Sequence, residues 1–373
     1  MLFFLLLPIA LFSKEPTVCL NMIVKNEADV ICNCLKSVKP YIDTWVIVDT
    51  GSTDGTQELI KNEMKDMPGH LYERPWIDFA HNRNEAMQLA QNKADYYLFI
   101  DADETLDIQD DSELLHLSDQ FYTITVITED AVGCRILLAK TDVEWEWRGV
   151  IHETLYCNEK QSSTDLKKVR LNALSLLGAR TKDPNKYKKD IAFIQSAIQK
   201  DPSNTRLHFY LATTYETDEQ YDQAYMAYSK CSRLDVERDI EFFCLYRMAA
   251  MRECLHHKKE DIIKAYWRAY YCDPGRYEPL YHIAKYYFDD DNILLSYILC
   301  QRALLHREEY KPPLSIRSVG EYELDLLTAL CEIGMKFDSS VERLEQLLKK
   351  TLLPEETIDV IERALVLAHK ETG

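Results

Sequence analysis

The stretch Tyr96-Tyr97-Leu98-Phe99-Ile100-Asp101-Ala102-Asp103-Glu104 decides the fold of the first half of this chain. Its five apolar or aromatic residues predict a buried strand, and two carboxylates one residue apart follow directly. Open α/β folds bind ligands at the edge where such strands end. Two carboxylates there repel each other unless a cation lies between them, and Mg²⁺ or Mn²⁺ prefers oxygen ligands. Asp101 and Asp103 are therefore candidate metal ligands, although acidic residues also end strands as solvated caps.

A second strand-and-loop pattern lies upstream. The β-branched run at 44–48 ends in Asp49-Thr50-Gly51-Ser52-Thr53-Asp54-Gly55-Thr56, which an amphipathic helix follows. A strand, an Asp, a small-residue turn and a helix form the first half of a nucleotide-binding βαβ unit. The alternative is a capped turn, in which a side chain at 52–54 simply begins the helix. The two patterns together, in this order, favour a nucleotide site.

The first half of the chain alternates between strand and helix patterns. Strands are expected at 17–24, 44–48, 70–74 and 96–100, with helices at 27–38, 57–65 and 81–92. Two antiparallel strands are then expected at 121–128 and 132–140, with a turn at Glu129-Asp130. Parallel units followed by antiparallel strands predict a Rossmann-like mixed sheet.

From about Asp183 the pattern changes to a helical period. Phe209-x-Leu211-Ala212, Tyr246-x-Met248-Ala249 and Tyr281-x-Ile283-Ala284 recur at intervals of about 36 residues, close to the tetratricopeptide period. Small residues such as Ala224 and Ser296 follow where paired helices would cross. The expected domains are thus an apolar segment at 1–15, an α/β domain at 16–180 and a TPR-like domain at 183–373.

Composition narrows the functional classes. The 373 residues carry 44 basic and 62 acidic side chains, a net charge of −18, which argues against a nucleic-acid partner. The eleven cysteines are scattered and odd in number, which favours reduced thiols.

The N-terminal run Leu2 to Phe12 is almost wholly apolar but shorter than the roughly 20 residues that a spanning helix needs. A degenerate signal peptide, a short membrane anchor and a misassigned start all fit it. We expect the protein to be cytoplasmic, with membrane association through this segment as a further option.

Four ordered motifs carry a family resemblance: Met22–Glu27 (MIVKNE), Val48–Thr56 (VDTGSTDGT), Phe79–Ala86 (FAHNRNEA) and Phe99–Glu104 (FIDADE). Together they resemble family 2 glycosyltransferases of the GT-A fold, over roughly residues 17 to 180. The chain also resembles the bacterial subgroup in which tetratricopeptide-like helices follow this domain, a layout shared by the sublancin-type peptide S-glycosyltransferase.

The resemblance implies roles for four residues. Asp49 would contact the base or ribose of the nucleotide, Asp101 would lie toward the ribose and the metal, and Asp103 would bind the metal directly. Arg83 would pair with the diphosphate or the base carbonyl, and its alternative role is a surface salt bridge. The implied ligands are Mn²⁺ or Mg²⁺ and a nucleoside-diphosphate sugar, with a UDP-sugar as the expected donor.

The stretch 145–153 contains the candidate catalytic base. By the resemblance, His152 would be a third metal ligand, and Glu153 would remove the acceptor's proton. Many relatives carry this base in a Glu-Asp pair, and the comparable pair, Glu129-Asp130, reads as a hairpin turn. The alternative is that His152 and Glu153 form a structural salt bridge.

The expected activity is metal-dependent inverting transfer of a sugar to a protein, peptide or glycan acceptor. The helical repeats would recruit the acceptor or form a homodimer. One rival is a non-catalytic TPR adaptor with a degenerate transferase domain. Another rival is a haloacid-dehalogenase-type phosphatase, because Asp101-x-Asp103-x-Thr105 also fits the first motif of that family. That fold, however, places the motif on its first strand.

Overall fold

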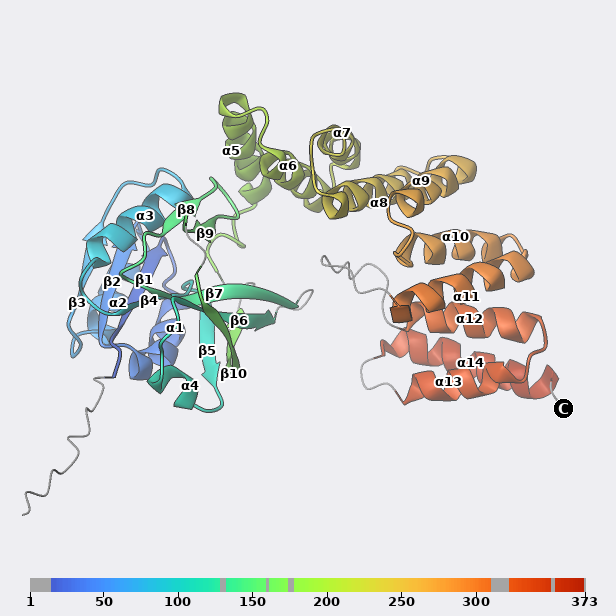
Figure 1. Ribbon diagram of the computed structural model, residues 1–373, viewed down its shortest axis with the longest axis horizontal. Coiled ribbons are helices and arrows are strands. Elements are labelled where there is room, and N and C mark those ends of the chain that lie inside the picture. Colours follow the sequence, from blue (N-terminus) through green and yellow to red (C-terminus); the bar gives the residue numbers. More distant parts are fainter. Residues whose placement is uncertain are drawn as a thin grey trace, which may run out of the picture. The chain divides into compact units, whose positions relative to one another are not determined.

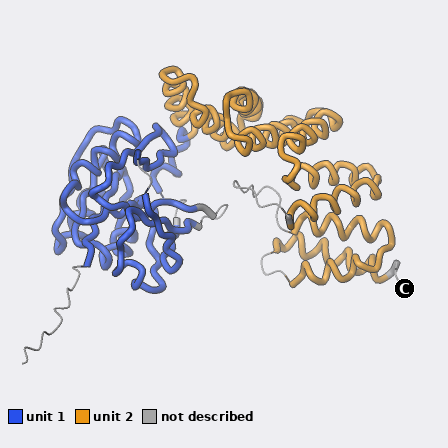
Figure 2. Tube along the Cα trace, in the orientation of Figure 1, with its two compact units in different colours: residues 1–186 blue, residues 187–373 orange. Residues whose placement is uncertain are grey.

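The computed structural model describes residues 15–127, 132–158, 161–173, 178–309, 322–349 and 353–371. The chain divides into two units, residues 1–186 and 187–373, coloured separately in Figure 2. The domain limits expected from the sequence, 16–180 and 183–373, stay predictions.

The first unit is a mixed α/β structure (Figure 1). Its strands are β1 (Val18–Val24), β2 (Thr44–Asp49), β3 (Gly69–Glu73), β4 (Tyr96–Phe99), β5 (Glu104–Ile108), β6 (Phe121–Ile127), β7 (Val132–Lys140), β8 (Glu146–Arg148), β9 (Thr154–Tyr156) and β10 (Ser163–Ala173). Its helices are α1 (Ile31–Val38), the 3₁₀ helix η1 (Lys39–Tyr41), α2 (Thr56–Glu63), α3 (Phe79–Ala90) and α4 (Ser112–Leu115).

The main sheet has eight strands in the order β3-β2-β1-β4-β7-β6-β10-β5, and β8 pairs with β9 separately. Strands β3, β2, β1 and β4 are parallel, and β7 then runs antiparallel to β4. Val24 is level with Asp49, and Asn21 with Phe99, so the strands end at one edge. Between β1 and β4 the strand order reverses, which is where such sheets bind ligands.

Alternating side chains of the buried strands fill two cores, one on each face of the sheet. On one face Leu20 and Met22 of β1 pack with Ile31 and Leu35 of α1. On the other, Cys19 packs with Met87 of α3 and with Leu155 of the β8–β9 hairpin. The expected Rossmann-like mixed sheet is confirmed.

One expected helix begins later than the sequence pattern indicated. Helix α1 starts at Ile31 rather than at Glu27, because Asn26 adopts a left-handed backbone (φ 56°) and the following residues form a loop. That loop therefore lies at the carboxyl edge of the sheet and not on its covered face.

The second unit consists of helices. They are α5 (Lys186–Lys200), α6 (Thr205–Thr217), α7 (Tyr221–Cys231), α8 (Arg238–Cys254), α9 (Lys259–Cys272), α10 (Glu278–Asp289), α11 (Ile293–Glu309), α12 (Glu323–Gly334), α13 (Ser339–Leu348) and α14 (Glu355–Glu371). The three repeated motifs fall on α6, α8 and α10, the first helices of successive pairs. Their alanines, Ala212, Ala249 and Ala284, are fully buried, which confirms the TPR-like repeat.

Polar side chains join neighbouring helix pairs. Arg247 of α8 donates from Nε to Oε2 of Glu216 on α6, at 3.1 Å. Farther along, the hydroxyl of Tyr246 lies 2.8 Å from Nε2 of His282 on α10. The imidazole of His282 also stacks on Tyr266 with ring centroids 4.5 Å apart. These contacts supplement the apolar packing between repeats.

The expected membrane association needs correction. In the part of the chain that the structure describes, no helix combines the length and the apolar character needed to cross a bilayer. The apolar run Leu2 to Phe12, on which that expectation rested, lies outside the described residues.

Candidate active site

Loops that follow β1 and β2 are tied together at the carboxyl edge. The Asn26 N–H donates to Ser52 Oγ, and Asn26 Oδ1 accepts from the Thr53 N–H, both at 2.8 Å. The Ala28 N–H donates to Oδ2 of Asp54 at 3.0 Å. The motifs MIVKNE and VDTGSTDGT thus form one braced surface beside the end of β4.

Asp49 ends β2 and is fully buried. Its Oδ1 accepts hydrogen bonds from the N–H groups of Gly51 and Ser52, both at 2.9 Å, and from Nε2 of Gln57 at 3.0 Å. Within the described residues, its Oδ2 is buried without a hydrogen-bond partner. Buried polar atoms nearly always have partners, so a lone acceptor here suits a ligand's N–H or O–H group.

Asp101 lies between two arginines. Its Oδ1 is 2.6 Å from Nη2 of Arg83, and its Oδ2 is 3.6 Å from Nη1 of Arg135. Burial alone would raise the pKa of Asp101, but the two guanidinium groups outweigh it and hold the pKa at about 2. Asp101 is therefore ionised throughout the physiological range.

Asp103 is in the opposite electrostatic situation. Burial, and then the negative charge of Asp101, raise the pKa of its carboxyl group. Gly178 lies directly against it, because a Cβ added there would be 2.6 Å from Oδ2 of Asp103. The next residue, Ala179, donates its N–H to Oε2 of Glu27 at 3.2 Å. Segment 178–179 thus borders the acidic edge.

Arg83 joins three of the sequence motifs. It projects from α3, and its side chain is only 10% exposed. Its Nε donates to Oε1 of Glu153 at 2.6 Å, while its guanidinium carbon lies 5.1 Å from the ring centre of Trp147. The structure therefore brings Arg83, Asp101 and Glu153 together through ion pairs of a largely buried arginine, whereas the alternative role expected for Arg83 was a salt bridge at the surface.

His152 lies in the loop between β8 and β9. Its side chain is exposed, its backbone is left-handed (φ 50°), and Gly149 in the same loop has φ 112°. In the described ranges no group of three or more His, Cys, Asp or Glu side chains could hold a metal ion. His152 thus does not join Asp101 and Asp103 in a three-ligand cluster here, and its role as a ligand stays a prediction.

The acidic pair nevertheless fits a hard cation that brings its other ligands from substrate or water. Burial, and then the charge of Asp101, disfavour ionisation of Asp103, and a divalent ion beside both carboxylates would favour their ionised forms. Asp103 would be the direct ligand, with Oδ2 of Asp101 beside it. The acidic pair Glu129-Asp130, which is the alternative candidate for the catalytic base, lies outside the described residues.

Sequence reasoning missed three residues of this edge: Glu27, Glu104 and Arg135. Both glutamates stood inside the quoted motifs MIVKNE and FIDADE, so their presence was visible but not their contacts. Arg135 belongs to β7, and nothing in its local pattern pointed to the site. It forms a bidentate ion pair with Glu104, at 2.9 and 2.5 Å.

Glu27 should make the metal-free protein less stable as pH rises. Burial is the main reason why its pKa rises from 4.5 to about 7, with Asp103 and Asp101 adding to the effect. The folded protein keeps a proton that the unfolded chain has released between these pH values, so stability falls across that window. Discounting for partial exposure, we expect a loss of roughly 1–2 kcal/mol.

Urea unfolding with EDTA at several pH values would measure this effect. Glu27→Gln should flatten the curve between about pH 5 and pH 7, where Glu27 changes its charge. Glu58→Gln, a change of equal charge on the exposed face of α2, is the control. Parallel curves for wild type and Glu27→Gln would contradict the assignment.

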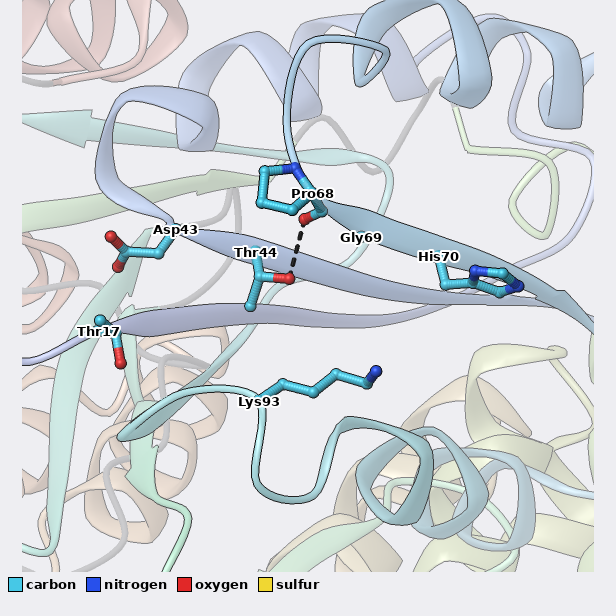
Figure 3. A pocket seen from close by; sticks show the side chains of 7 residues that line it. All are labelled: Thr17, Asp43, Thr44, Pro68, Gly69, His70 and Lys93. Atoms are coloured by element: carbon cyan, nitrogen blue, oxygen red, sulfur yellow. Dashed lines mark hydrogen bonds between the residues drawn. The ribbon is translucent and has the colours of Figure 1, made fainter.

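A cavity of about 430 Å³ lies elsewhere, beside the amino ends of the parallel strands (Figure 3). Its lining includes Asp43, Thr44, His70 and Lys93, and the Thr44 hydroxyl donates to the Pro68 carbonyl at 2.8 Å. None of the candidate site residues lines it. We place the functional site at the carboxyl edge, where the charged side chains meet.

Residues 19–163 match the family model of glycosyl transferase family 2. This part of the chain is a family 2 glycosyltransferase domain, which confirms the resemblance drawn from the four motifs.

Two curated relatives match parts of this chain. Glycosyltransferase SunS, encoded by the SPbeta prophage of Bacillus subtilis, is 37% identical over 91 residues, which are 24% of this chain and 21% of SunS. A TPR repeat-containing protein of Synechococcus elongatus is 35% identical over 116 residues, 30% of this chain and 27% of that protein. The chain thus spans about a fifth to a quarter of these relatives.

Among solved structures, the MamA protein matches with 16% identity and a TM-score of 0.35, covering 47% of this chain and 92% of MamA. A likeness of this size carries no argument about function.

Proposed function

We propose that the chain transfers a sugar, with inversion, from a nucleoside-diphosphate sugar to a protein, peptide or glycan acceptor, with Mn²⁺ or Mg²⁺. The observation that carries the proposal is the pairing of two features at one sheet edge. Asp49, at the end of β2, presents a buried acceptor atom without a partner among the described residues. Asp101 and Asp103 follow β4, which is separated from β2 in the sheet by β1 alone. These features suit a nucleoside and a cation-bound diphosphate, respectively.

Each residue would have a distinct task. Asp49 Oδ2 would accept a hydrogen bond from the base or ribose, with a UDP-sugar as the expected donor. Asp101 and Asp103 would hold the cation, with His152 as a candidate third ligand from the neighbouring loop. A divalent cation supplies stabilisation of the charge on the departing diphosphate. Arg83 would face the same diphosphate from α3.

Glu153 is the proposed catalytic base. As the acceptor attacks the anomeric carbon and the bond to the diphosphate breaks, the acceptor loses a proton, which a carboxylate can take. Arg83 binds Oε1 of Glu153, so this carboxylate is held in one orientation. Its second oxygen, Oε2, would receive the proton.

The helical unit would recruit the acceptor, with pairing of two copies of the chain as the alternative. Repeated helix pairs present long surfaces suited to peptides and proteins.

A thermal-shift panel tests the donor site. Nucleoside diphosphates and their sugars would be tested with and without Mn²⁺. A ligand at about 100 times its Kd adds roughly 2.7 kcal/mol of stability, which raises the melting temperature measurably. Metal-dependent hydrolysis of the donor would then separate a transferase from an adaptor. No shift with any nucleoside diphosphate would contradict the proposal.

A fragment ending at Lys186 should keep the donor site and lose the acceptor. The first unit ends there, and Lys182 and Arg180 make contacts within it, with Asp29 at 2.7 Å and with the ring of Phe79 at 4.5 Å. Calorimetry should give the same affinity for UDP with Mn²⁺ in fragment and intact chain. Modification of an acceptor should fall much more than hydrolysis of the donor. Equal modification by a folded fragment would contradict the recruiting role.

A further inference from the structure

Glu104 and Arg135 form a braced pair beside Asp101. Glu104 begins β5, and its side chain is only 8% exposed. Its Oε2 accepts the backbone N–H of Asp101 at 2.8 Å, while Arg135 of β7 reaches both of its oxygens. A bidentate arginine–carboxylate pair has a defined geometry, so the position of each guanidinium nitrogen is fixed.

The same arginine also faces the Asp101 side chain. Nη1 of Arg135 is 3.6 Å from Oδ2 of Asp101, too far for a hydrogen bond but close for two opposite charges. With the Asp101 N–H bound to Glu104, the contacts close a ring through Asp101, Glu104 and Arg135. Arg83 holds the other oxygen of Asp101 at 2.6 Å. The Asp101 carboxylate is therefore constrained from both sides.

The charge of Arg135 is paired with Glu104 and Asp101, but this pairing does not decide how Arg135 affects a bound cation. A fixed positive charge next to a candidate metal ligand repels a divalent cation. If Arg135 acted only through its charge, removing it would strengthen cation binding. If it acts by orienting Asp101, removing it would weaken cation binding. These opposite signs make its role measurable.

We propose that Arg135, braced by Glu104, is a positioning residue that orients Asp101 to bind the cation of the donor together with Asp103. The inference rests on the proposed function. It adds two residues, from β5 and β7, to a site otherwise built from the ends of β2 and β4, from α3 and from the loop between β8 and β9.

The test measures binding of Mn²⁺ by its electron paramagnetic resonance signal and binding of UDP, with and without Mn²⁺, by calorimetry. Arg135→Met should weaken Mn²⁺-supported UDP binding by at least about tenfold and should not tighten Mn²⁺ binding. Binding of UDP alone should be unchanged, because Asp49 and Arg83 remain. Arg135→Lys should recover only part of the loss, since an ammonium lacks the two-pronged geometry.

Arg343→Met is the matched control. Arg343 is 27% exposed, against 33% for Arg135, and it contacts both oxygens of Glu332 in the helical unit, at 3.3 and 3.2 Å. It should remove a similar ion pair without changing UDP binding.

The outcomes separate the two proposals. Wild-type protein that binds none of the nucleoside diphosphates of the thermal-shift panel with Mn²⁺ would overturn the proposed function. Wild-type binding together with unchanged or tighter binding in Arg135→Met would overturn the role of Arg135. If Arg135→Met fails to fold, Arg135→Lys and Glu104→Gln decide the question. Wild-type affinity in both would contradict the proposal, and weaker Mn²⁺-supported binding in both would uphold it.

Discussion

Replacing Asp103 with asparagine should reduce donor turnover by about 10³-fold or more, equivalent to roughly 4 kcal/mol of transition-state stabilisation. Asparagine keeps the shape but loses the charge that would hold the cation. The fold should survive, because burial and the charge of Asp101 already oppose ionisation of Asp103. Removing that charge should leave the melting temperature of the metal-free protein equal or higher.

Hydrolysis of a UDP-sugar, followed with Mn²⁺ and with EDTA, measures this effect. Asp107→Asn is the control, since Asp107 is exposed on β5, four residues along the chain. EDTA should remove wild-type activity, and excess Mn²⁺ should restore it. Full turnover in Asp103→Asn would show that the acidic pair does not hold the cation.

Glu153→Gln should lower transfer to a hydroxyl acceptor by a factor of about 10² to 10⁴, the usual contribution of a general base. Glutamine can still accept the hydrogen bond from Arg83 through its amide oxygen, but it cannot take a proton at neutral pH. The rate of transfer to a thiol acceptor should fall less, because a cysteine sulfur is already partly ionised near pH 7.

The salt bridge with Arg83 offers a competing explanation that the same variant tests. If Glu153 only holds Arg83 in place, Glu153→Gln should weaken donor binding and reduce hydrolysis and transfer equally. If Glu153 is the base, donor affinity should stay near the wild-type value while transfer falls. Glu146→Gln, 57% exposed on β8, controls for loss of charge in the same hairpin.

Strongly patterned segments of the fold were predictable. The runs at 44–48 and 96–100 are buried strands, because continuous apolar sequence is what a doubly covered parallel sheet requires. Strand β10 was not foreseen. Its sequence, Ser163–Ala173, carries charged residues between Leu166, Val169 and Leu171, and only pairing with β6 and β5 makes it a strand.

Prediction of the site stopped where contacts depend on tertiary pairing. Asp49 and Asp101 were visible because each directly follows an apolar run, and Asp103 because it stands two residues after Asp101. Arg135 is 31 residues from Glu104, and its position relative to Glu104 depends on how β7 and β5 fit into the sheet. Similarly, the contact of Glu153 with Arg83 spans 70 residues. No local sequence pattern predicts either of these long-range contacts.

The contacts of His282 between neighbouring helix pairs make the stability of the helical unit depend on pH. Burial, with the nearby charges of Lys285 and Arg247, lowers the pKa of His282 from 6.5 to about 3. The folded unit therefore binds this proton less readily than the unfolded chain does. The contribution of His282 to the stability of the helical unit declines as pH falls below about 6.5, while the contribution of Glu27 to the stability of the α/β unit declines as pH rises toward 7. Acidification thus acts in opposite directions at these two residues.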